Sequence, residues 1–200
     1  MLEVIFIRHG QSEANMDDVI VSYQGDPGLT AEGWAEARRA AQVFDLEPLT
    51  AIYASPLRRT RETASAFQRV GIDVQVDDRL HEIALGRWDG MTIDAILGAD
   101  RERYQQWKDN PELGAPDGGE ALSAVATRLA SFLDDVRRRH PEGRIIATTH
   151  SDCLKALLLW VLRAPWTSAK WYHLHNTAGL SVEWHSSHWQ VRGYPLMPPK

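Results

Sequence analysis

Short apolar runs, each cut off by polar residues, recur along the chain and predict buried strands. The two clearest lie at Leu2–Ile7 and Arg144–Thr149, where β-branched residues are frequent. A histidine follows each run, His9 after one intervening arginine and His150 directly, so the same pattern occurs twice, far apart in the sequence. The predicted strands are Leu2–Ile7, Ala51–Ala54, Val74–Val76, Arg144–Thr149, Val182–Trp184 and Trp189–Arg192.

Helices are predicted between these runs, where capping residues precede stretches with helical spacing. Thr30 can cap the first helix, and Ser55 followed by Pro56 supplies an N-cap and a first-turn proline for the second. Either Ser151 or Asp152 can cap the last. The predicted helices are Ala31–Asp45, Pro56–Val70, Glu120–His140 and one that ends at Leu162, and two shorter helical pieces are predicted within Thr92–Asp109. The predicted loops are Leu80–Gly90 and Asn110–Gly119.

Strands that alternate with helices call for a largely parallel sheet, because a parallel crossover needs a helix-length connection. The fold class predicted is therefore α/β, with helices on both faces of the sheet. Two hundred residues without repeats or long linkers favour one domain over residues 1–200.

Composition narrows the partners that we expect. The formal net charge is -5 and the pI about 5.9, so no basic surface predicts binding to nucleic acid or to an anionic membrane. Cys153 is the single cysteine, which excludes an intramolecular disulfide and fits a reducing compartment. No signal peptide or membrane-spanning stretch is recognisable, and we expect a cytoplasmic protein.

Three chemically active side chains follow three different predicted strands. His9, Arg59 and His150 all lie just after strand ends, and such ends meet at the carboxyl edge of a parallel sheet, where ligands bind. Helix N-termini and guanidinium groups both bind phosphate oxygens well, and Arg8 adds a second guanidinium. The pattern predicts a site for an oxyanion.

The motifs around these residues resemble those of the histidine phosphatase superfamily, the phosphoglycerate mutase-like proteins. Five ordered blocks carry the resemblance, and together they extend over about three-quarters of the chain. They are Arg8-His9-Gly10-Gln11-Ser12 with Asn15; Leu29-Thr30 with Gly33; Ser55, Leu57, Arg59, Thr63 and Ala64; Leu80, Glu82, Gly86, Trp88, Asp89 and Gly90; and Gly118-Gly119-Glu120 followed by His150, with Asn176 a weaker sixth match.

The resemblance implies a three-layer α/β/α sandwich and a phosphoric monoester hydrolase that needs no metal or other cofactor. His9 would be the nucleophile and carry a phosphohistidine, and Glu82 would protonate the leaving oxygen and later activate water. Such an acid at neutral pH would need its pKa raised by burial or by a neighbouring anion. The groups expected to hold the phosphoryl group are Arg8, Arg59, His150, Asn15, Gln24 and Gly25.

Other functions remain open at this point. A cofactor-dependent phosphoglycerate mutase is the first alternative, although Ile83-Ala84-Leu85 stands where mutases carry basic residues after the glutamate. A non-catalytic phospho-ligand binding protein is a second, and a metal site of His9, Glu82, His150 and Asp152 a third.

Substrate identity is not encoded in these motifs. The segments 16–28 and 87–119 are expected to set specificity, and Asp152 is expected to tighten the pocket or alter its charge. The partners predicted are a small phosphate monoester and, as an option, a second copy of the chain in a homodimer.

Overall fold

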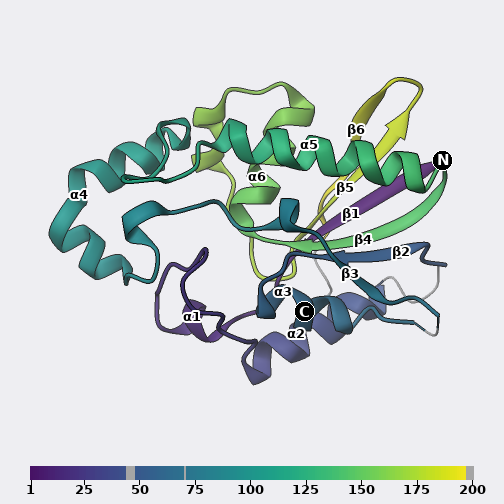
Figure 1. Cartoon of the computed structure of the whole chain (residues 1–200), viewed down its shortest axis with the longest axis horizontal. Coiled ribbons are helices and arrows are strands. Elements are labelled where there is room, and N and C mark those ends of the chain that lie inside the picture. Colours follow the sequence, from purple (N-terminus) through teal and green to yellow (C-terminus); the bar gives the residue numbers. More distant parts are fainter. Residues whose placement is uncertain (44–47, 70, 197–200) are drawn as a thin grey trace.

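A computed structural model describes residues 1–43, 48–69 and 71–196. Within these ranges six strands form one sheet in the order β3-β2-β4-β1-β5-β6 (Figure 1). The first four strands in this order are parallel, and β5 and β6 form an antiparallel hairpin at one edge. The strands are β1 (Leu2–Arg8), β2 (Ala51–Ala54), β3 (Val74–Val76), β4 (Gly143–Thr149), β5 (Gly179–His185) and β6 (His188–Leu196).

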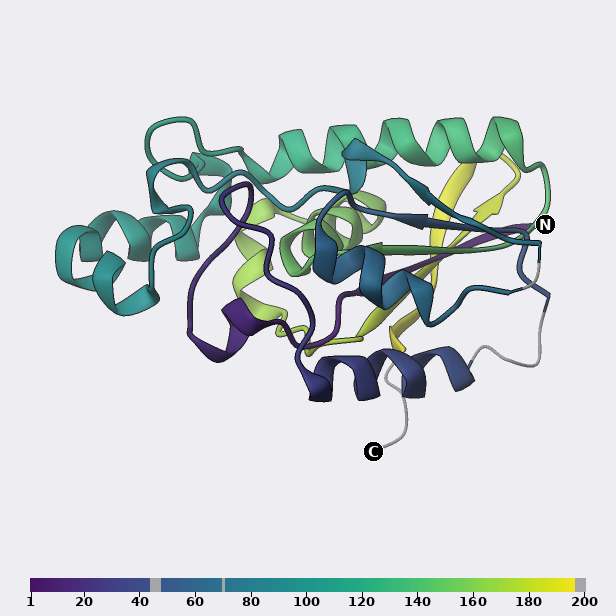
Figure 2. The same ribbon diagram turned by 60° about the horizontal axis from the view of Figure 1, so that its bottom comes forward.

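Helices cover both faces of this sheet (Figure 2). The helices α2 (Ala31–Val43) and α3 (Arg58–Ser65) lie on one face, and α5 (Leu122–Arg139) and α6 (Ser151–Leu162) lie on the other. Each face buries its own apolar cluster, because side chains of a strand point alternately to opposite sides. The predicted three-layer α/β/α sandwich with a mostly parallel sheet is therefore confirmed.

The remaining helices are short or broken. The helix α4 (Ile93–Asp109) is interrupted by non-helical backbone at Asp100, which confirms the two predicted pieces. The turn α1 (Glu13–Met16) was not predicted. Short 3-10 turns lie at Asp78–Leu80, Gly86–Trp88, Pro111–Leu113 and Trp166–Trp171.

Several predicted helix boundaries are wrong. The helix α3 begins at Arg58 with Leu57 as its N-cap, two residues after the predicted start at Pro56, and the Ser55 hydroxyl lies 2.9 Å from the Nε2 atom of His150. His150 itself occupies the N-cap position of α6, so neither Ser151 nor Asp152 caps that helix.

Other boundaries shift by a few residues or fall outside the described chain. The Thr30 hydroxyl does cap α2, accepting a hydrogen bond from the Gly33 N–H at 3.0 Å. The helix α5 starts two residues after the predicted Glu120. The predicted end of the first helix, Asp45, lies outside the described residues, whereas α3 ends at Ser65, five residues before the predicted Val70.

Candidate active site

The sheet register brings the two motif histidines together. Arg8 at the end of β1 pairs with Thr149 at the end of β4, so His9 and His150 leave the sheet side by side. The His9 N–H donates to the Thr149 carbonyl at 3.0 Å, and the two imidazole centroids lie 5.3 Å apart. The predicted convergence at the carboxyl edge is confirmed.

Close packing of backbone explains the glycine after the first histidine. A Cβ atom on Gly10 would overlap the carbonyl of Gly33 in the first turn of α2, so only glycine fits. The Gly10 N–H donates to the Thr63 hydroxyl of α3 at 3.0 Å. Three motif positions thus fix the turn that carries His9.

Hydrogen bonds define the tautomer of His9. Its Nδ1 atom lies 2.7 Å from the Gly10 carbonyl, and the Nε atom of Arg59 lies 3.2 Å from its Nε2 atom. Arginine only donates and a carbonyl only accepts, so Nδ1 carries the proton and Nε2 presents a lone pair. Burial, followed by the charges of Arg59 and Arg8, holds the pKa of His9 well below its ordinary value of 6.5.

Arg59 organises the floor of the site. Its Nη2 atom donates to the Val21 carbonyl at 2.9 Å and lies 3.3 Å from the Nδ1 atom of His150. Burial and the charge of Arg59 likewise hold the pKa of His150 well below its ordinary range. Both imidazoles are therefore neutral near pH 7.

Four buried guanidinium donors have no partner among the described residues, and two of them, Nη1 of Arg59 and Nε of Arg8, lie at this site. Another Arg8 nitrogen, Nη1, donates to the Leu174 carbonyl. A buried unpaired donor is costly, and an oxyanion that accepts from it removes that cost. The site is therefore built for an anion that the protein's own residues do not supply.

Glu82 lies partly buried beside these cations. Its Oε1 atom accepts from the Ile83 N–H at 2.9 Å. Burial, helped by the negative charge of Asp152, raises the pKa of Glu82 to about 7, against the opposing effect of the two arginines. The sequence analysis expects the pKa of such an acid to be raised by burial or by a neighbouring anion, and both act on Glu82.

Two further residues brace the segment that carries Glu82. The Cys153 thiol donates to the His81 carbonyl at 2.8 Å, and burial raises its pKa to about 12, so it is a structural thiol. The Glu120 N–H donates to the Ala84 carbonyl at 2.9 Å, and its carboxylate pairs with Arg128 at 2.9 Å. The glycine-glycine-glutamate motif thus supports the segment that carries Glu82 from outside the cavity.

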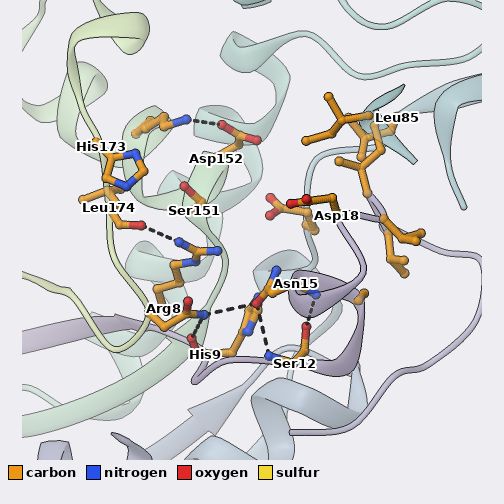
Figure 3. A pocket seen from close by; sticks show the side chains of 18 of the residues that line it. Arg8, His9, Ser12, Asn15, Asp18, Leu85, Ser151, Asp152, His173 and Leu174 are labelled. Carbon is orange, nitrogen blue, oxygen red and sulfur yellow. Dashed lines mark hydrogen bonds and ion pairs between the residues drawn. The ribbon is translucent and has the colours of Figure 1, made fainter. Parts of the chain in front are cut away.

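A cavity of about 500 Å³ opens onto these groups (Figure 3). Among the predicted site residues, Arg8, His9, Asn15, Arg59 and Glu82 line it, while His150 lies behind Arg59. Both segments expected to set specificity contribute to its wall, through Val19, Ile20, Val21, Tyr104, Trp107 and Lys108.

Asn15 is held in a defined orientation at the cavity wall. Its Oδ1 atom accepts from the Ser12 N–H and from Nδ2 of Asn176, each at 3.2 Å. The amide nitrogen is therefore the end of Asn15 that remains for a phosphate. Asn176 also donates to the His9 carbonyl at 3.0 Å. The weaker sixth match of the sequence motifs is thus in direct contact with the first block.

Gln24 and Gly25 are not among the described residues that line the cavity. The Ser22, Tyr23 and Gln24 N–H groups all donate to the Asp89 carboxylate, at 2.6 to 2.8 Å, and this anchor turns Gln24 toward Gly90. The role of Gln24 and Gly25 in phosphate binding therefore stays a prediction. Asp89 was matched as a motif position, but its role as a loop anchor was not predicted.

The sequence reasoning missed the far wall of the cavity. Lys155, Tyr172, His173 and His175 line it without having been predicted. A signal existed for one of them, since Lys155 lies one helical turn after Ser151 and Asp152 and so shares their face. The alternative of a metal site at His9, Glu82, His150 and Asp152 gains no support, because no three or more His, Cys, Asp or Glu side chains in the described ranges are arranged to hold an ion.

The site thus places a neutral imidazole beside unpaired guanidinium donors in a cavity at the carboxyl edge of an α/β/α sandwich. The chain belongs to the histidine phosphatase superfamily (branch 1), whose family model matches residues 4–195. None of the helices in the described part of the chain has the length and apolar character needed to cross a bilayer.

Named relatives include both phosphatases and mutases. Phosphoserine phosphatase 1 of Hydrogenobacter thermophilus is 34% identical over 160 residues, 78% of this chain and 74% of that protein. A probable phosphoglycerate mutase GpmB of Photorhabdus laumondii is 30% identical over 199 residues, 97% of this chain and 90% of the relative. The structure of mycobacterial glucosyl-3-phosphoglycerate phosphatase Rv2419c with VO3 superposes with a TM-score of 0.87 at 27% identity, covering 96% of this chain and 98% of that chain.

Proposed function

We propose that this protein hydrolyses small phosphate monoesters through a phosphohistidine on His9, without a metal or other cofactor. The observation that carries the proposal is the Nε2 lone pair of His9, held beside Arg59 in a cavity with unpaired guanidinium donors. An imidazole nitrogen is a nucleophile only when neutral, and the lowered pKa of His9 keeps it so.

In the first step, His9 Nε2 attacks phosphorus and the bond from phosphorus to the ester oxygen breaks. Glu82 gives its proton to the departing oxygen, which leaves as an alcohol. Arg8 and Arg59 hold the equatorial oxygens, and their charge stabilises the transferring group. The product of this step is phosphohistidine beside an ionised Glu82.

In the second step, the Glu82 carboxylate removes a proton from water, and the hydroxide oxygen forms a bond to phosphorus. The bond between phosphorus and His9 Nε2 breaks, so inorganic phosphate leaves and both groups return to their starting protonation states. The same buried carboxyl serves both steps because its pKa lies near the working pH.

The apolar segment after Glu82 favours a phosphatase over a mutase. Ile83 is fully buried and Leu85 lines the cavity, so this segment supplies no cation to retain a bisphosphate intermediate. We expect 3-phosphoglycerate to release inorganic phosphate, with and without added 2,3-bisphosphoglycerate. If 2-phosphoglycerate forms faster than phosphate is released, and only with the bisphosphate present, the protein would be assigned to the mutases.

A cytoplasmic location and a homodimer stay predictions.

The proposed mechanism predicts that kcat/KM falls above about pH 7. Glu82 must be protonated in the free enzyme, its pKa is raised to about 7, and so each further pH unit removes about nine-tenths of the active form. His9 has a lowered pKa and is already neutral there. Because a phosphate ester itself titrates near pH 6, the profile is measured in parallel with Glu82→Gln.

The fall of kcat/KM at alkaline pH should vanish in Glu82→Gln, whereas the pH dependence caused by ionisation of the substrate phosphate should persist. Asp152→Asn should move the alkaline limb to lower pH, because it removes the neighbouring negative charge and frees the Lys155 ammonium. An alkaline limb that is the same in the parent protein and in Glu82→Gln would show that Glu82 is not the acid.

A further inference from the structure

The peptide group between Val21 and Ser22 is held from both sides. Its N–H, which belongs to Ser22, donates to Oδ1 of Asp89 at 2.6 Å. Its carbonyl, which belongs to Val21, accepts from Nη2 of Arg59 at 2.9 Å. The N–H and the C=O of a trans peptide lie in one plane and point in opposite directions. The hydrogen bond to Asp89 therefore also fixes the direction of the carbonyl that holds Arg59.

The loop on both sides of this peptide is anchored as well. Asp89 is buried, with 8% of its surface exposed, and its Oδ2 atom accepts from the N–H groups of Tyr23 and Gln24 at 2.7 and 2.8 Å. Before the peptide, the Ile20 carbonyl accepts from the Gly90 N–H at 2.8 Å. Hydrogen bonds to a carboxylate are stronger than those between neutral groups, so Asp89 is the strongest of these anchors.

The three nitrogens of the Arg59 guanidinium have separate tasks. Nε lies 3.2 Å from Nε2 of His9, Nη2 donates to the Val21 carbonyl, and Nη1 has no partner among the described residues. The guanidinium is planar, with its donors in a fixed fork. A rotation that breaks the Nη2 hydrogen bond therefore also turns Nε away from His9 and redirects Nη1.

The same loop contacts the segment of Glu82 on both sides of that residue. The Tyr23 ring stacks on the His81 imidazole, with centroids 3.8 Å apart and an angle of 14° between the planes. The Ser22 hydroxyl accepts from the Leu85 N–H at 3.2 Å. The anchored loop thus ties the arginine of the phosphate site to the segment that carries the acid.

We propose that Asp89 is a positioning residue for phosphoryl transfer, which acts through the peptide of Val21 and Ser22 to hold the Arg59 guanidinium with Nη1 directed at a phosphoryl oxygen. The inference rests on the proposed phosphatase function and adds to it a residue outside the reacting groups. The negative charge of Asp89 polarises the peptide, which makes the Val21 carbonyl a better acceptor for the guanidinium. Without this charge, neither the peptide nor Arg59 keeps a single direction.

The test is a double-mutant cycle that measures the affinity for orthovanadate. Vanadate adopts the geometry of a phosphoryl group in transfer, and its binding needs no turnover. Asp89→Asn keeps the size of the side chain but removes its charge and one acceptor oxygen. It should weaken vanadate binding about tenfold, the scale of one hydrogen bond to a charged group, and lower kcat/KM for p-nitrophenyl phosphate to a similar extent.

Arg59→Lys provides the second background of the cycle. Lysine keeps the positive charge, so vanadate should still bind, but an ammonium is a point charge without the fixed fork of a guanidinium. In this background Asp89→Asn should change the affinity for vanadate by less than about twofold, because the group on which Asp89 acts is gone. A merely structural role of Asp89 would give the same loss in both backgrounds.

Asp135→Asn is the matched control. It removes a carboxylate that pairs with Arg79 and Arg138 on the far side of α5, and Asp135 is not among the described residues that line the cavity. Vanadate affinity and turnover should stay within about twofold of the parent values. Urea unfolding shows whether each variant is folded. If Asp89→Asn is not, Asp89→Glu replaces it in the cycle, because it keeps both oxygens and displaces them by one methylene.

Equal weakening of vanadate binding in the parent protein and in Arg59→Lys would overturn the proposal, because the effect would then not pass through Arg59. So would a folded Asp89→Asn variant that binds vanadate as tightly as the parent protein. Absence of p-nitrophenyl phosphate turnover in the parent protein would instead contradict the proposed function. The two failures are distinguishable, since vanadate affinity is measured without turnover.

Discussion

Replacement of His9 by alanine is expected to lower kcat for a phosphate monoester by about 10⁴-fold or more, the scale on which covalent enzymes respond to loss of their nucleophile. Alanine removes the only protein atom that bonds to phosphorus in the proposed mechanism, the Nε2 atom beside Arg59. Because the guanidinium donors remain, substrate binding should survive the change. Initial rates of phosphate release, with equilibrium binding of inorganic phosphate, measure the two effects separately.

The controls for this variant address folding and metal. His185→Ala removes an exposed histidine at the end of β5 and should keep the parent rate. The far-ultraviolet circular dichroism of His9→Ala should match that of the parent protein, because the turn at Gly10 is fixed by backbone contacts with Gly33. EDTA should leave the parent enzyme active. Retention of more than about a hundredth of kcat in His9→Ala, or strong inhibition by EDTA, would contradict the proposed mechanism.

Replacement of Glu82 by glutamine is expected to lower kcat/KM for an alkyl phosphate by about 10³-fold, within the usual range for a general acid. Glutamine keeps the size of the side chain and an oxygen that can accept from the Ile83 N–H, but it has no proton to give. With p-nitrophenyl phosphate the loss in the first step should be smaller, because p-nitrophenolate departs without a proton.

The second step should then limit turnover in Glu82→Gln, because no carboxylate activates the water. A stopped-flow trace with p-nitrophenyl phosphate should show a burst close to one equivalent of p-nitrophenolate, followed by slow turnover. Glu102→Gln, which changes an exposed glutamate of α4, should show the parent kinetics. Equal losses for alkyl and nitrophenyl esters, with no burst, would remove Glu82 from the role of acid and base.

Local sequence patterns were sufficient to predict the centre of the site. His9, Arg59 and His150 each follow a strand, and the alignment of Arg8 with Thr149 in the sheet brings their side chains together. The elevated pKa of Glu82 was foreseen as a requirement. Its causes, burial and Asp152, depend on how α6 packs against the segment after β3, which no local pattern specifies.

The parts that sequence reasoning missed depend on long-range contacts. Ser55 looks like a helix cap, but its hydroxyl is used by His150, 95 positions along the chain. Gln24 lies in a loop whose path is set by the Asp89 carboxylate, 65 positions away. Lys108 and Lys155 lie on different helices, and only the packing of α4 and α6 around the cavity makes them neighbours.

The most direct test of the central claim is the location of the phosphoryl group in the covalent intermediate. Glu82→Gln is mixed with p-nitrophenyl phosphate, quenched in base to preserve phosphohistidine, digested and mapped by mass spectrometry. The account predicts a base-stable, acid-labile phosphoryl group on the peptide that contains His9, at the imidazole, and its absence in a double variant with His9→Ala. Phosphate on Cys153 or on a serine, or a burst without any phosphoenzyme, would contradict it.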